Sequence, residues 1–62
     1  MKTLIIQKHH NDITLKAIVM YDKEGCMIDA EGWERQYVRY LVDATKRAKE
    51  MLTTSMDEIK YA

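Results

Sequence analysis

The 62-residue chain contains no proline, no phenylalanine, two glycines and one cysteine. The single cysteine, Cys26, excludes an internal disulfide, and two glycines are too few for the known phosphate-binding loops. Ten Lys and Arg residues balance ten Asp and Glu residues, whereas proteins that bind nucleic acid non-specifically are usually basic. No apolar run approaches the roughly 20 residues of a membrane span, and the start has no export signal, so we expect a cytoplasmic protein.

The length predicts a single domain over residues 1–62. A chain of this size buries only about 60% of its unfolded surface, so its core is small. Small proteins gain stability from disulfides, metals or oligomerisation. Because His9-His10 has none of the spacings of metal motifs, we expect no metal and no cofactor. The remaining option is oligomerisation, and we expect a homodimer.

The first half of the chain has the period-two pattern of β-strands. Residues 3–8 are rich in Ile and Leu, and residues 26–29 form a third, short segment. In residues 13–21 every second side chain from Ile13 onward is apolar, with Thr14 and Lys16 on the other face. The sequences at 11–12 and 22–25 have the residue types of tight turns. We therefore predict an antiparallel three-stranded meander.

Beyond residue 29 the apolar period changes from 2 to 3.6, which predicts a long amphipathic helix. It is expected to begin near Asp29 or Gly32 and to end at residues 53–55. A capping-box sequence then predicts a short C-terminal helix with Ile59 and Tyr61 inward. The predicted fold class is α+β, in the order β-β-β-α with a helical tail. One helical stripe, expected to lie in the core, consists of Trp33, Tyr37, Tyr40, Leu41, Ala44, Ala48, Met51 and Leu52.

The residues show no arrangement typical of a catalytic site. Cys26 has no glycine-rich oxyanion loop near it, so we interpret it as an edge-strand or core residue. The carboxylates Asp29, Glu31 and Glu34 are residue types that favour a helix N-terminus. We therefore expect that the protein is not an enzyme.

The alternation in residues 13–21 sends Ile18 and Met20 to the sheet face away from the helix, and Met27 is expected beside them. A single helix covers only one face of a sheet. The other face is then either a surface for a partner or is covered by the C-terminal residues. Methionine adapts to partners of different shape. We predict that Ile18, Met20, Met27 and the helical residue Val42 contact a protein partner or a second copy.

Four basic residues lie within roughly 80° of one another on the far side of the predicted helix. This basic stripe consists of Arg35, Arg39, Lys46 and Lys49. Two of them lie four residues before an acidic residue, which is also typical of a solvated face. The stripe predicts, as an alternative function, binding of an anion or a nucleic acid.

The main functional prediction is a small non-enzymatic interaction protein that oligomerises and binds or inhibits another macromolecule. The β-β-β-α order occurs in small DNA-binding domains that use their sheet, and in compact inhibitors encoded by phages and mobile elements. Architecture alone says little about function, so the assignment as a phage inhibitor of host machinery is a prediction by analogy.

Overall fold

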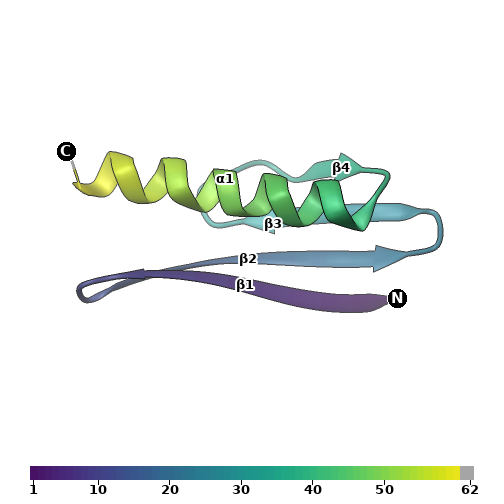
Figure 1. Ribbon diagram of the computed structural model, residues 1–62, viewed down its shortest axis with the longest axis horizontal. Coiled ribbons are helices and arrows are strands. Elements are labelled where there is room, and N and C mark those ends of the chain that lie inside the picture. Colours follow the sequence, from purple (N-terminus) through teal and green to yellow (C-terminus); the bar gives the residue numbers. More distant parts are fainter. Residues whose placement is uncertain (61–62) are drawn as a thin grey trace.

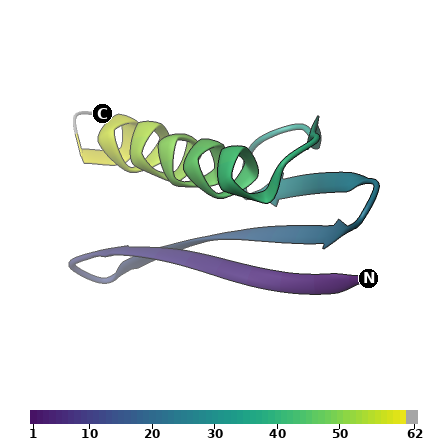
Figure 2. The ribbon, with the colours of Figure 1, turned by 45° about the vertical axis from the view of Figure 1, so that its right-hand side comes forward.

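The computed structural model describes residues 1–60. The four strands form one antiparallel sheet in sequence order, and the helix lies on one side of it and contacts every strand (Figure 1, Figure 2). The α+β class, the antiparallel meander and the long helix that follows it are therefore confirmed. The elements are β1 (Lys2–His10), β2 (Ile13–Asp22), β3 (Gly25–Ala30), β4 (Gln36–Val38) and α1 (Leu41–Lys60).

Two tight turns join the three long strands at the predicted places. Asn11 has a φ of 53°, a left-handed conformation that Asn tolerates better than most residues. At the second turn, Oδ1 of Asp22 accepts hydrogen bonds from the backbone N–H groups of Glu24 (2.8 Å) and Gly25 (3.2 Å). These turns fix the strand register, and the register decides which side chains share a face.

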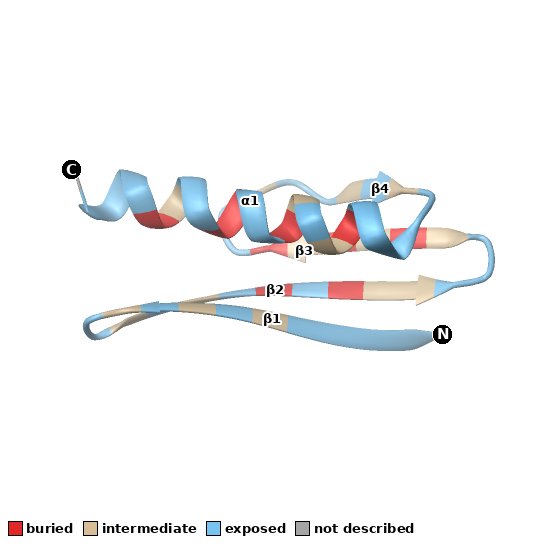
Figure 3. Cartoon of the chain, in the orientation of Figure 1, coloured by how far each residue is buried: buried red, intermediate tan, exposed pale blue. Residues whose placement is uncertain are grey.

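The buried side chains come from one face of the sheet and one stripe of α1 (Figure 3). Ala44 and Ala48 lie one turn apart on that stripe, and their small side chains let the helix approach the sheet closely. The larger Met51, Leu52 and Met56 continue the same stripe towards the end of the helix. The sheet contributes Ala17, Val19, Cys26, Ile28 and Ala30.

The predicted start of the helix is wrong. Gly32 has a φ of 81°, in a turn closed by a hydrogen bond from the Trp33 N–H to the Ala30 carbonyl (3.1 Å). The chain then forms β4, which pairs with β3. The helical spacing of the aromatic residues was misleading, because β4 satisfies backbone groups along an edge of β3 that a helix would leave unpaired.

The later start changes the position of the aromatic side chains. Trp33 packs against the core as predicted, but Tyr37, with 72% of its surface exposed, and Tyr40 both lie outside it. The predicted break at residues 53–55 is also wrong, because α1 continues to Lys60. Ile59 is 42% exposed rather than buried, and Tyr61 lies outside the described residues.

We predict that Gly32→Ala lowers the free energy of unfolding by about 1 kcal/mol, because a left-handed φ is unfavourable for a residue with a Cβ. No atom lies within 4 Å of the added Cβ, so the effect is conformational and not steric. Urea denaturation followed by circular dichroism measures it. In a helix interior the same change would raise stability, so a stabilised variant would contradict the turn.

We predict that Ile28→Ala lowers the free energy of unfolding by about 2–5 kcal/mol, because Ile28 is fully buried between the sheet and the helix. The matched control is Ile59→Ala, which removes the same atoms from a half-exposed position near the helix end. Thermal unfolding of the two variants is compared. Equal losses would contradict the described core.

Candidate interaction surface

The outer face, meaning the side of the sheet that faces away from α1, gathers most of the predicted partner-binding residues. Directly opposed residues of antiparallel strands point to the same face. The register therefore defines rows of neighbouring side chains that run across the sheet. One row consists of Thr3, Met20, Met27 and Tyr37, and the next consists of Ile5, Ile18 and Asp29.

The outer face is apolar at its centre and is not covered by any residue in the described part of the chain. Ile5 is 58% exposed, Ile18 is exposed, and Met20 and Met27 are partly exposed. The last turns of α1, up to Lys60, do not fold back over it, because Met56 is buried on the helix side of the sheet. Among residues 1–60 the outer face is thus uncovered, and its role as a surface for a partner stays a prediction.

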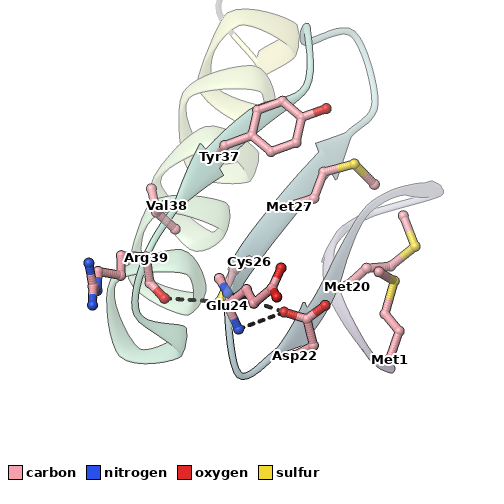
Figure 4. Close-up of a pocket in the computed structure, with 10 residues that line it drawn as sticks. Met1, Met20, Asp22, Glu24, Cys26, Met27, Tyr37, Val38 and Arg39 are labelled. Carbon is pink, nitrogen blue, oxygen red and sulfur yellow. Dashed lines mark hydrogen bonds between the residues drawn. The ribbon is translucent and has the colours of Figure 1, made fainter.

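The methionines line a hollow of about 540 Å³ on this face. Figure 4 shows Met1, Met20, Met27 and Tyr37 projecting from the same side of the strands. Thioether side chains are flexible and polarisable, so they adjust to an apolar surface placed against them. The hollow is therefore suited to receiving side chains of a partner.

Charged side chains lie at the two ends of the apolar centre. On β2 the outward-pointing residues follow one another as Lys16, Ile18, Met20 and Asp22. Glu24 in the adjoining turn adds a second carboxylate beside Asp22 at the hollow. The outward side chains of β2 thus run from a lysine through an apolar middle to an aspartate. Glu31 lies beside Lys16, whose backbone N–H donates a hydrogen bond to Oε2 of Glu31 (3.3 Å), and Arg39 lines the hollow with Asp22 and Glu24.

Arg47 attaches β4 to the helix and so determines where Tyr37 lies. Its Nε donates a hydrogen bond to Oε1 of Gln36 (2.9 Å), and its guanidinium lies 5.4 Å from the centre of the Trp33 ring. Trp33 in turn donates a hydrogen bond from Nε1 to Oγ of Ser55 (2.7 Å). Arg47 could not be recognised from the sequence, because its spacing on the helix gives no sign of a contact with residues eleven and fourteen positions earlier.

The other predicted binding residues do not join the outer face. Val42 is 76% exposed, but it lies on α1. The basic stripe does not exist as a helix face, because Arg35 and Arg39 precede α1 and only Lys46 and Lys49 belong to it. Arg35 instead lies 3.8 Å from a carboxylate oxygen of Asp29. Nucleic-acid binding stays a prediction, but the four basic residues do not share the single helix face on which it was based.

The two histidines and the cysteine do not form a common site in the described part of the chain. His9 and His10 both belong to β1, where successive side chains point to opposite faces, and Nδ1 of His9 lies 2.8 Å from Oγ1 of Thr14. Cys26 is buried in the core, which resolves the two interpretations of it. Within residues 1–60, no three His, Cys, Asp or Glu side chains are grouped as metal ligands. The same residues include no helix with the length and apolar character to cross a bilayer.

The chain matches no family model, no curated protein and no solved structure. The functional argument therefore rests on the geometry of the outer face.

We predict that Trp33→Phe and Ser55→Ala each lower the free energy of unfolding by about 1 kcal/mol, because each removes one partner of the same hydrogen bond. The double variant is expected to lose less than the sum of the two. Urea denaturation followed by circular dichroism gives all four values of this cycle. Strict additivity would show that the two side chains do not interact.

Proposed function

We propose that this chain is a non-enzymatic interaction protein that forms a homodimer through its outer face and acts by binding or inhibiting another macromolecule. The observation that supports the proposal is the uncovered apolar centre of the outer face. Contiguous exposed apolar surface of this kind marks interaction sites in natural proteins. The residues involved are Ile5, Ile18, Met20, Met27 and Tyr37.

A second copy is the proposed occupant of this face, because two copies would cover each other's apolar centre. The molecule measures 38 × 17 × 15 Å, so the flat area of one long side is roughly 600 Å². Projecting side chains make the accessible area of that side larger. A stable interface of standard size buries about 800 Å² on each partner. A homodimer would therefore use nearly the whole outer face, including its charged ends, and would enlarge a core that is small in the single chain.

The edge strands are less suited to self-association than the outer face. The edge strand β1 contains Lys2 and Lys8, and lysine on an edge strand opposes pairing with another strand. The other edge strand, β4, has only three residues. These features support dimerisation through the face of the sheet and not through an edge strand.

We predict that the wild-type chain is a dimer and that the double variant Met20→Lys, Met27→Lys is a folded monomer. Two lysines at the centre of the outer face would have to be desolvated in the dimer but stay in water in the monomer. Size-exclusion chromatography with light scattering gives the mass, and circular dichroism checks the fold.

The matched control is Thr54→Lys, which adds a lysine on the exposed side of α1 and is expected to remain a dimer. A wild-type chain that stays monomeric well above micromolar concentration would contradict the proposal. A double variant that still dimerises would contradict the use of the outer face.

A further inference from the structure

We infer that the second copy stacks on the outer face with its strands antiparallel to those of the first, so that Asp22 of each copy meets Lys16 of the other. This inference rests on the proposed function and specifies the partner surface and its orientation. The twofold axis lies between the two sheets and runs across the strands, near the level of Val19 in β2.

The order of side chains along β2 determines the pairing in this arrangement. The outward residues read Lys16, Ile18, Met20, Asp22, so a rotation about the level of Val19 exchanges the two ends. Ile18 of one copy then faces Met20 of the other, which joins the apolar centres. Lys16 of one copy faces Asp22 of the other, which gives two symmetry-related ion pairs.

The alternative twofold axis, parallel to the strands, gives no pair between Lys16 of one copy and Asp22 of the other. It places Asp22 and Glu24 of both copies at one end of the interface and Lys16 of both copies near the other end. Opposed like charges across an interface are unfavourable, and complementary charges fix the orientation in which two surfaces meet. Only the antiparallel stack brings Lys16 of one copy to Asp22 of the other.

The short strand β4 provides a second complementary contact in the same arrangement. Tyr37 lies in the row of Met20 and Met27, whereas Arg35 reaches Asp29 in the row of Ile18. Exchange of these two rows places the exposed ring of Tyr37 over Arg35 of the other copy. A guanidinium over a tyrosine ring is a favourable cation–π contact.

This arrangement is compatible with known sheet packing. Two sheets that stack face to face lie about 10 Å apart and cross at about 30° because each sheet is twisted. The dimer would consist of four layers, with the two sheets inside and the two helices outside. Both uncovered apolar faces would then be buried.

A zero-length carbodiimide cross-link between Lys16 and Asp22 tests the orientation. In one chain these residues lie on the same strand, six positions and roughly 20 Å apart, so a direct amide bond between them cannot form within one chain. We expect such a link in the dimer formed from equal amounts of ¹⁴N-labelled and ¹⁵N-labelled protein. Mass spectrometry should show mixed-isotope peptides joined through this pair.

A charge variant tests the same contact at equilibrium. We expect Lys16→Glu to weaken the dimer by about tenfold, because it places two carboxylates together at both symmetry-related positions. The matched control is Lys8→Glu, which makes the same charge change on the helix side of the sheet, where Lys8 is paired with Leu15, and should leave the dimer unchanged. Sedimentation equilibrium measures both dissociation constants.

The outcomes separate this inference from the proposed function. The wild-type chain could form a dimer that the double variant Met20→Lys, Met27→Lys disrupts. If that dimer gives no Lys16–Asp22 link and is not weakened by Lys16→Glu, the antiparallel stack is overturned and the proposed function is kept. A wild-type monomer would overturn both. A wild-type chain that binds a different protein through Met20 and Met27, and not a second copy, would also overturn the inference.

Discussion

The imbalance between one helix and a two-sided sheet is the constraint on which the rest of this structure depends. A sheet presents side chains on both faces, and α1 covers only one of them. On the covered face Val19 and Ile28 are fully buried, whereas Ile5 and Ile18 on the outer face stay exposed to water. Burial of apolar surface is the main favourable contribution to both folding and association, so the uncovered face is where further stabilisation is available.

The fourth strand contacts the helix on one side and contributes Tyr37 to the outer face on the other. β4 is only three residues long, and a strand this short depends on contacts beyond its backbone pairing. The hydrogen bond from Arg47 to Gln36 provides one such contact, and the Trp33 ring beneath the same guanidinium provides another. Because Gln36 points to the helix, its neighbour Tyr37 must point outward, and it extends the apolar row of Met20 and Met27.

Two features make the outer face more specific than a simple apolar patch. Methionine side chains at the centre can adapt to a partner, which favours contact but contributes little to orientation. In the proposed dimer, the opposite charges of Lys16 and Asp22 at the two ends of β2 supply the orientation, because they meet only when the strands of the two copies are antiparallel. Adaptable apolar contact and directional charge are combined on one strand of ten residues.

Alternation along residues 13–21 was sufficient to predict that Ile18 and Met20 point to one face of the sheet and that Ala17 and Val19 point to the other. A period of two is a local property, fixed by the backbone of each strand. The same kind of argument predicted the turns and the existence of the helix. These features are decided by neighbours in the sequence.

The position of residues 33–40 was decided only by the tertiary structure. Their spacing fits a helix, but β4 pairs with β3 and the basic stripe is divided as a result. The contact of Arg47 with Gln36 and the shared row of Met20, Met27 and Tyr37 depend on the same long-range pairing. Local pattern determined the three long strands, their faces and the presence of the helix. The pairing of β4 with β3 was determined by the need to satisfy backbone groups at the edge of the sheet. This interaction joins residues that are distant in the sequence, so local spacing does not show it.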